Sequence, residues 1–105
     1  MKNEEYILCA AIWYKDFPKT VSHYMCTNIE EGVVLCGHRH HNIIGQCISL
    51  LDKRQAELGK YVQGFITSKN RFLTREEALI IALKENQVID INEIRGDRLY
   101  SEDLY

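Results

Sequence analysis

The apolar residues in the first third of the chain follow a pattern that predicts β-strands. Residues 6–13 read Y-I-L-C-A-A-I-W, an unbroken apolar run that is typical of a central strand. Residues 20–27 and 32–36 are predicted as two further short strands, separated by an acidic turn at residues 28–31. We therefore expect three strands before residue 37.

After these strands the spacing of the apolar residues changes. Between residues 40 and 58 they recur at intervals of three and four, which is the spacing of one face of a helix. The residues on this face are Ile44, Cys47, Ile48 and Leu51. Gly59 follows as a typical stop, because glycine readily adopts the backbone conformation that ends helices. One long helix is predicted here.

The second half of the chain begins with a predicted hairpin. Residues 61–67 form its first strand, and a polar turn at residues 68–70 leads into residues 71–73. The next residues, T-R-E-E, match a capping box, in which the Thr74 hydroxyl accepts one free amide and the Glu77 carboxylate accepts another. A second helix therefore begins at Thr74.

This second helix is apolar on nearly all sides. Its run A-L-I-I-A-L at residues 78–83 predicts that it is largely buried, and it ends near residues 85–86. Residues 88–105 then combine a short strand or turn with a polar tail. Because strands and helices are mixed without regular β-α-β alternation, we expect one domain over residues 1–105 of the α+β class. Its small antiparallel sheet would pack with two main helices.

Composition narrows the range of functions. Of the 105 residues, 46% are apolar and 27% are charged, which is ordinary for a folded globular protein. A formal charge of −2 and an isoelectric point near 6.1 argue against a long nucleic acid as partner, because domains that bind one are strongly basic. No apolar stretch reaches the roughly 20 residues that span a bilayer. The acidic start M-K-N-E-E is unlike a signal peptide, so we expect a cytoplasmic protein without a membrane partner.

The cysteines fit the same compartment. Cys9, Cys26, Cys36 and Cys47 include no C-x-x-C pair, so the chain has neither a zinc-ribbon nor a thioredoxin motif. Cys9 and Cys47 stand inside apolar patterns, where cysteine usually serves as a small buried hydrophobe. The thiols are expected to be reduced.

The distribution of charge says more than its total. Residues 32–75 carry 7 basic and 2 acidic side chains, whereas residues 76–105 carry 3 basic and 8 acidic ones. The middle of the chain can therefore present a local anion site, although solvated surface charge would give the same counts. Arg39, Arg71 and Arg75 stand at the ends of predicted elements, where guanidinium groups suit phosphate oxygens.

Two aromatic residues and a histidine run offer further candidate chemistry. Phe65 and Phe72 flank the hairpin, where each ring could stack on a base or pack in the core. In the run C-G-H-R-H-H at residues 36–41, Arg39 would oppose a metal cation, so no metal site is predicted. The histidines could act as acid and base on a phosphodiester, or simply cap the helix that begins there. No known nucleophile motif accompanies them.

Four motifs together resemble a known family of small phage proteins. They read A-A-I-W-Y-K, H-R-H-H-N-I-I, G-F-I-T-S-K-N-R-F-L-T-R-E-E-A and R-L-Y-S-E-D-L-Y. The chain is similar to the first class of Thoeris anti-defence sponge proteins. The resemblance covers most of the chain and is most specific over residues 64–78 and 99–105, whereas residues 16–35 match no pattern of that family.

The resemblance implies a binding protein that is not an enzyme and needs no cofactor or metal. Members of that family sequester cyclic ADP-ribose isomers made by bacterial TIR-domain proteins, and some also hold cyclic di- or trinucleotides at separate sites. It further implies a homo-oligomer, dimer-based and hexameric, with pockets between subunits. The ligand residues that it implies are Arg39, His40, His41, Phe65, Thr67, Arg71, Phe72, Arg75, Arg98, Tyr100, Ser101 and Asp103.

Two other functions remain open at this point. A small phosphodiesterase or nucleotide hydrolase would use the histidines of residues 38–41 and would turn its ligand over. A phage inhibitor that binds a protein would need no small-molecule site, and its arginines would be surface charge. A hydrolase would convert its ligand to a product, whereas a sponge would not. For an inhibitor that binds a protein, substituting the arginines should leave the function intact.

Overall fold

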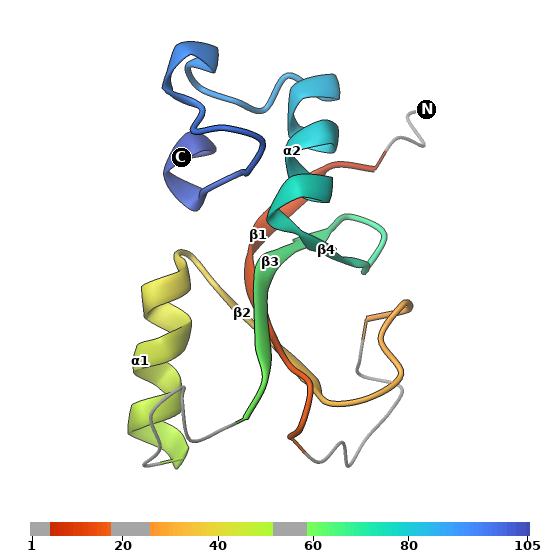
Figure 1. Cartoon of the computed structure of the whole chain (residues 1–105), viewed down its shortest axis with the longest axis vertical. Helices are drawn as coiled ribbons and strands as arrows, with labels where there is room; N and C mark the ends of the chain where they lie inside the picture. The colour runs from red at the N-terminus through yellow and green to blue at the C-terminus, as the bar shows by residue number, and fades with distance from the viewer. Residues whose placement is uncertain (1–4, 18–25, 52–58) are drawn as a thin grey trace.

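The structure is a computed structural model that describes residues 5–17, 26–51 and 59–105. Its strands form one antiparallel sheet in the order β2-β1-β3-β4 (Figure 1). The strands are β1 (Ile7–Tyr14), β2 (Val33–Gly37), β3 (Tyr61–Thr67) and β4 (Phe72–Thr74). The helices are α1 (His40–Leu51) and α2 (Arg75–Lys84), followed by two 3-10 turns, η3 (Ile91–Glu93) and η4 (Ser101–Asp103). The predicted α+β class is confirmed.

β1 is a central strand, as its apolar run predicts. It pairs with β2 on one side and with β3 on the other, so that Ala10 lies opposite both Gly37 and Phe65. A strand with two neighbours satisfies its backbone groups on both edges and has both faces available for burial. Ala10, Ile12 and Tyr14 are accordingly inaccessible to solvent.

Alternation along the strands divides the buried side chains between two clusters. The main core joins Ile12 and Phe65 of the sheet with Ile43 of α1 and Leu79 of α2. The side chains that alternate with these point to the opposite face of the sheet. Buried there are Ala11, Cys26, Ile29 and Phe72. Both helices and the C-terminal residues therefore pack against the main core, on one face of the sheet.

Several predicted boundaries agree with the structure, and others lie outside the described residues. The strand predicted over residues 32–36 is β2, and the one over residues 61–67 is β3. Of the strand predicted over residues 20–27, only Cys26 and Thr27 are described, and neither is in a strand. Residues 52–58 of the first predicted helix also lie outside the described residues.

The second helix begins as predicted but is not largely buried. Thr74 Oγ1 accepts the Glu77 N–H at 3.3 Å, and Glu77 Oε1 accepts the Thr74 N–H at 2.9 Å, which completes the capping box. Burial is confined to Ala78, Leu79 and Ala82. Ile80 and Leu83 are 69% and 43% exposed, so the prediction of a largely buried helix was wrong. The helix packs against its neighbours along one side only, and apolar composition does not say which side.

Of the two cysteines predicted to be buried, Cys47 is buried and Cys9 is not. Cys47 is buried in α1, with its Sγ 3.5 Å from the Tyr14 hydroxyl. Cys9 is half-buried rather than buried, because it lies on β1 close to Cys36 of the edge strand β2. Cys36 itself is exposed.

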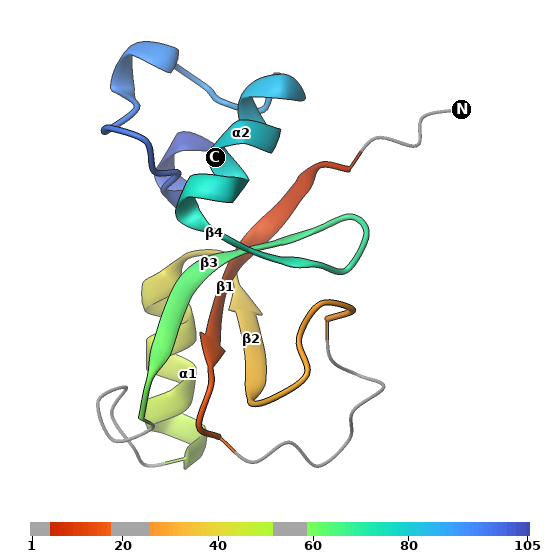
Figure 2. The same ribbon diagram turned by 45° about the vertical axis from the view of Figure 1, so that its right-hand side comes forward.

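The C-terminal residues fold back onto the protein instead of forming a wholly polar tail. Leu99 is inaccessible to solvent, and its N–H donates to the Arg75 carbonyl at the start of α2. The Gln87 amide binds both the N–H and the carbonyl of Ile7, at 2.8 Å each, as a neighbouring strand would. Figure 2 shows this segment beside α2 and above the N-terminal end of α1.

Candidate functional site

The residues that the resemblance assigns to a ligand occupy three main parts of the structure. One group lies where the N-terminal ends of α1 and α2 meet the C-terminal residues (Figure 1). We define the tail cluster as the assigned residues of this group together with two neighbours that were not assigned, Arg95 and Tyr105. Its members are Arg39, Arg75, Arg95, Arg98, Tyr100 and Tyr105. Thr67 and Arg71 lie at the turn between β3 and β4. His40, Phe65 and Phe72 lie in the interior.

Within the tail cluster, two arginines lie over the ring of Tyr100. The guanidinium carbons of Arg75 and Arg95 are 4.5 and 4.0 Å from the ring centroid, within the range of cation–π contacts. Arg75 also donates to the Leu99 carbonyl at 2.9 Å and to Gln63 Oε1 at 2.5 Å. Burial lowers the pKa of Arg75, but a guanidinium keeps its proton at ordinary pH. Its charge is held in place by groups that do not neutralise it.

Arg39 is held against Tyr105 in a similar way. Its guanidinium carbon is 5.2 Å from the Tyr105 ring centroid, and its Nη2 donates to the Tyr105 backbone oxygen at 2.5 Å. The Tyr105 hydroxyl donates to the His38 carbonyl at 2.7 Å. In the part of the chain that the structure describes, Arg39 Nη1 is the buried side-chain atom without a hydrogen-bond partner. A buried donor without a partner is costly, so an acceptor that reached this atom would remove that cost.

Two carboxylates pair with arginines of the tail cluster, that of Glu102 with Arg95 and that of Glu76 with Arg98. Burial is the main cause of the pKa shifts of His40, Arg75 and Tyr105, and the charge of Glu102 raises the pKa of all three. The Glu102 oxygen is 4.0 Å from Arg95 Nη2. His40 and Arg75 are the first residues of α1 and α2, whose N-terminal ends add partial positive charge. Positive charge therefore exceeds negative charge at the tail cluster.

The other assigned residues near the tail cluster differ in their exposure. Arg98 is exposed and pairs with Glu76 at 3.2 Å. Ser101 and Asp103 are buried in η4, where the Asp103 carboxylate accepts the backbone N–H at the start of that turn. His41 is exposed on α1. The assignment of these four residues to a ligand stays a prediction.

The assigned aromatic residues of the hairpin belong to the interior. Phe65 is inaccessible to solvent, and Phe72 is 5% exposed with its ring against Trp13. His40 is buried edge-on against Phe65, and its Nε2 is 2.8 Å from the Gly64 carbonyl. Because burial lowers the pKa of His40 and a carbonyl only accepts, the ring is neutral and donates from Nε2. In this structure the two phenylalanines pack in the core, and the ring among the arginines is Tyr100.

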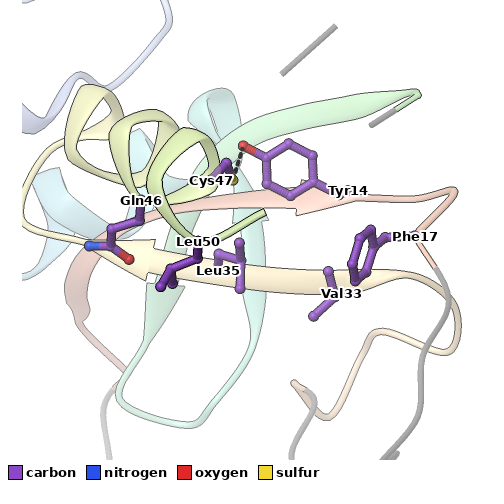
Figure 3. Close-up of a pocket in the computed structure, with 7 residues that line it drawn as sticks. All are labelled: Tyr14, Phe17, Val33, Leu35, Gln46, Cys47 and Leu50. Carbon is purple, nitrogen blue, oxygen red and sulfur yellow. Dashed lines mark hydrogen bonds between the residues drawn. The ribbon is translucent and has the colours of Figure 1, made fainter. Parts of the chain in front are cut away.

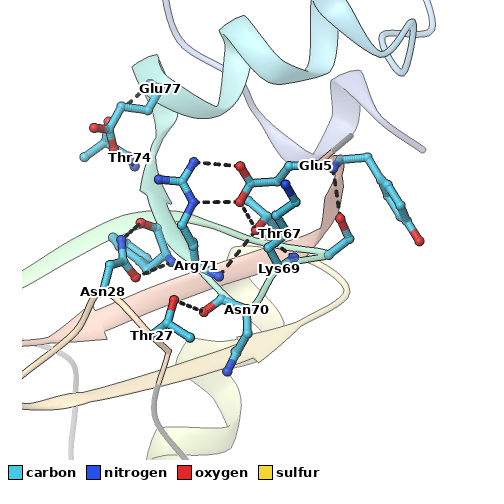
Figure 4. A network of polar contacts seen from close by, with 12 residues as sticks. Glu5, Thr27, Asn28, Thr67, Lys69, Asn70, Arg71, Thr74 and Glu77 are labelled. Carbon is cyan, nitrogen blue, oxygen red and sulfur yellow. Dashed lines mark hydrogen bonds and ion pairs between the residues drawn. The ribbon is translucent and has the colours of Figure 1, made fainter. Parts of the chain in front are cut away.

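Arg71 has a different environment from the arginines of the tail cluster. Its Nε and Nη2 each donate to a carboxylate oxygen of Glu5 at 2.7 Å, and the Thr67 hydroxyl donates to the same carboxylate (Figure 4). The hydrogen bond from Arg71 is the largest cause that lowers the pKa of Glu5 to about 2. Arg71 is thus paired with a full negative charge from its own chain.

Sequence reasoning missed three residues of this arrangement. Arg95 and Tyr105 belong to the tail cluster, and Glu5 binds Arg71. Arg95, the first arginine of R-G-D-R, was hidden by the acidic total of residues 76–105. No local pattern could have found Glu5, because it stands 66 positions from its partner.

An apolar groove lies elsewhere, between α1 and the sheet (Figure 3). Its volume is about 170 Å³, and Phe17, Val33, Leu35 and Leu50 form part of its lining. The Tyr14 hydroxyl is already bonded to Cys47. The described residues of its lining carry no charge, so they do not suit a phosphate.

Among the described residues, no three His, Cys, Asp or Glu side chains are grouped so that they could hold a metal ion. Neither α1, α2 nor any other helix in those residues is long and apolar enough to cross a bilayer.

The fold and the site define a small α+β protein with a four-stranded antiparallel sheet and an arginine–tyrosine cluster at its helix ends. The chain belongs to the phage T4 y16D protein family, whose model matches residues 6–105. This match identifies a phage protein family and names no activity. No curated protein and no solved structure matches the chain.

Proposed function

We propose that this phage protein binds a compact cyclic nucleotide of the cyclic ADP-ribose class at the tail cluster and holds it unchanged. By sequestering the signal, the protein would keep a bacterial defence effector inactive. The observation that carries the proposal is the set of arginines at Tyr100 and Tyr105, together with the buried Arg39 Nη1 that has no partner among the described residues.

The chemistry of the tail cluster supports a phosphate-bearing ligand. A guanidinium binds phosphate oxygens through parallel hydrogen bonds, and an aromatic ring contacts a base through its face. Arg39 and Arg75 are anchored by the backbone oxygens of Tyr105 and Leu99, so both are oriented before a ligand arrives. Such preorganisation reduces the entropic cost of binding.

The same residues favour binding over catalysis. The tail cluster consists of arginines and tyrosines, which hold anions and rings but are not activated as nucleophiles here. His40, which a hydrolase would need as an acid or base, is buried and bonded to the Gly64 carbonyl. We therefore propose that the protein is not an enzyme.

Assembly and location form part of the proposal. The tail cluster is a surface feature of one subunit, and a small chain has little room for a deep pocket. A homo-oligomer, dimer-based and hexameric, would complete the site between copies in the cytoplasm of the infected host. A cyclic di- or trinucleotide would occupy a separate site in the same assembly.

The test is incubation with a glycocyclic ADP-ribose. We expect the melting temperature to rise and mass spectrometry to recover the intact ligand after the protein is denatured. Recovery of a cleaved product would overturn the proposal in favour of a hydrolase. An unchanged melting temperature with no ligand bound would also overturn it and favour an inhibitor that binds a protein, for which the exposed Ile80 and Leu83 offer a surface.

A further inference from the structure

The turn between β3 and β4 builds an anion-binding arrangement apart from the tail cluster. We call Thr67, Lys69 and Arg71 the hairpin cradle. In Figures 1 and 2 this turn projects away from the C-terminal residues. Figure 4 shows that a carboxylate, that of Glu5, fills the cradle.

The backbone of the turn fixes the direction of the Thr67 hydroxyl. Thr67 Oγ1 accepts the N–H groups of Lys69 at 3.2 Å and Arg71 at 3.3 Å. A hydroxyl has two acceptor positions and one proton. With both acceptor positions used, the proton points to the Glu5 carboxylate, as the Thr67–Glu5 hydrogen bond shows. Asn70, at a φ of 57°, allows the tight turn that brings these N–H groups together.

The guanidinium completes a geometry that phosphate and carboxylate share. Arg71 Nε and Nη2 each contact one oxygen of Glu5 at 2.7 Å, the two-pronged arrangement in which arginine binds either anion. The charge of Lys69 also acts on the carboxylate. Hydroxyl and guanidinium therefore converge on one pair of oxygens, with the positive charge of Lys69 nearby.

Glu5 reaches the cradle from a different part of the chain. The next residue, Tyr6, pairs with the turn through two hydrogen bonds to Ser68, at 3.0 and 2.8 Å, which set the position of Glu5. The Glu5 side chain is 13% exposed, while that of Arg71 remains 43% exposed. An incoming anion can therefore reach the guanidinium from solvent while Glu5 occupies its inner side.

We propose that the hairpin cradle is a binding site for phosphate groups that Glu5 keeps closed, as an internal carboxylate in the position of the ligand. A phosphate-bearing ligand binds there by displacing Glu5. The carboxylate then sets the affinity of the cradle. The apparent affinity for a ligand is its affinity for the open cradle multiplied by the fraction of molecules in which Glu5 has left the cradle. This site lies beyond the proposed nucleotide site and does not depend on it.

Pyrophosphate is the probe for the test, with binding measured by calorimetry at low ionic strength. Glu5→Gln keeps the shape of the side chain and removes its charge, and Glu31→Gln is the matched control at an exposed position before β2, outside the cradle and the tail cluster. We expect pyrophosphate to bind Glu5→Gln about tenfold or more tightly than the control. Adding Arg71→Ala to Glu5→Gln should abolish that gain, whereas adding Arg39→Ala should leave it.

Each remaining outcome overturns the proposal. If Glu5→Gln binds pyrophosphate no more tightly than Glu31→Gln, Glu5 and Arg71 form a structural ion pair only. If the gain survives Arg71→Ala, the pyrophosphate is bound elsewhere. Should Glu5→Gln fail to fold, Glu5→Asp provides a second test. Its shorter side chain keeps the charge but reaches Arg71 less well, so it closes the cradle less tightly. Pyrophosphate must then raise the melting temperature of Glu5→Asp more than that of wild type, and an equal rise contradicts the proposal.

Discussion

The tail cluster and the hairpin cradle use the same residue type in opposite ways. In the cradle, Arg71 meets the Glu5 carboxylate through two hydrogen bonds of 2.7 Å, so its charge is cancelled within the chain. In the tail cluster, Arg75 donates to the Leu99 carbonyl and to the Gln63 amide oxygen and lies over the Tyr100 ring, so neutral groups orient its charge without cancelling it. Arg39 donates to the backbone oxygen of Tyr105 and lies over the ring of the same residue.

The difference shows that the partners of an arginine, and not the number of arginines, decide whether it is ready for an anion. A count of charges along the chain places Arg39, Arg71 and Arg75 on an equal footing. The structure separates them, because Arg71 faces a side-chain carboxylate at hydrogen-bond distance, whereas Arg39 and Arg75 contact backbone oxygens, an amide oxygen and tyrosine rings. The tail cluster is therefore the open site of the two, and the cradle is the closed one.

The largest effect should come from detaching the tail cluster from the core. Leu99 is inaccessible to solvent, and truncating such a side chain leaves a cavity. Leu99→Ala is expected to lower the free energy of unfolding by about 2–5 kcal/mol. Urea denaturation measures this change, with Leu50→Ala as control because Leu50 is 81% exposed. A loss for Leu99→Ala no larger than that of the control would mean that the tail cluster is not anchored to the core.

Arginine substitutions in the two regions should differ in their effect on stability. Arg75→Ala removes two hydrogen bonds and a ring contact from a half-buried position, and we expect a loss of about 2 kcal/mol. Arg71→Ala removes an ion pair that is partly exposed, and we expect about 1 kcal/mol. Thermal and urea denaturation of both variants give the ranking. The reverse ranking would contradict the assignment of Arg75 as the anchor of the tail cluster.

Lowering the pH should destabilise wild type more than a variant in which His40 is replaced by neutral glutamine. Burial lowers the pKa of His40 below its ordinary value of 6.5, so the unfolded chain takes up a proton before the folded protein does. The stability that neutral His40 contributes is thus present above pH 6.5 and is lost as the pH falls below that value. Denaturation at pH 7 and pH 5 should show this loss in wild type, and His40→Gln should reduce it. An equal loss in both proteins would exclude His40 as its source.

The smallest effect concerns the cradle. Because Arg71 holds the pKa of Glu5 near 2 against 4.5 in the unfolded chain, the pair stabilises the protein above pH 4.5. That stability is lost as the pH falls from 4.5 toward 2, and water around the exposed guanidinium limits it to about 1 kcal/mol. Comparing wild type with Glu5→Gln over this range isolates the contribution. Parallel curves for the two proteins would show that the ion pair adds nothing.

Local rules predicted those parts of the fold that local interactions determine. Thr74 and Glu77 stand three positions apart, so their capping box could be read from the sequence and is present. The apolar run around Ala10 likewise indicated a strand with neighbours on both sides.

Features that depend on distant partners could not be predicted in this way. Leu99 is one apolar residue in a polar segment, and only the position of α2 explains its burial. Ile80 and Leu83 have the same composition as buried residues, but they lie on the side of the helix that faces solvent. For the site, arginines at element ends could be recognised, whereas the carboxylate that closes the cradle could not.

The most direct test of the open site is a calorimetric titration of glycocyclic ADP-ribose into wild type, Arg39→Ala and Arg71→Ala. If the tail cluster binds the nucleotide, Arg39→Ala should weaken binding by about 1.5–3 kcal/mol, the contribution of charge-assisted hydrogen bonds. Arg71→Ala should leave the affinity within about threefold of wild type, because Glu5 already neutralises that guanidinium. Equal affinities for wild type and Arg39→Ala, with a large loss for Arg71→Ala, would contradict the account.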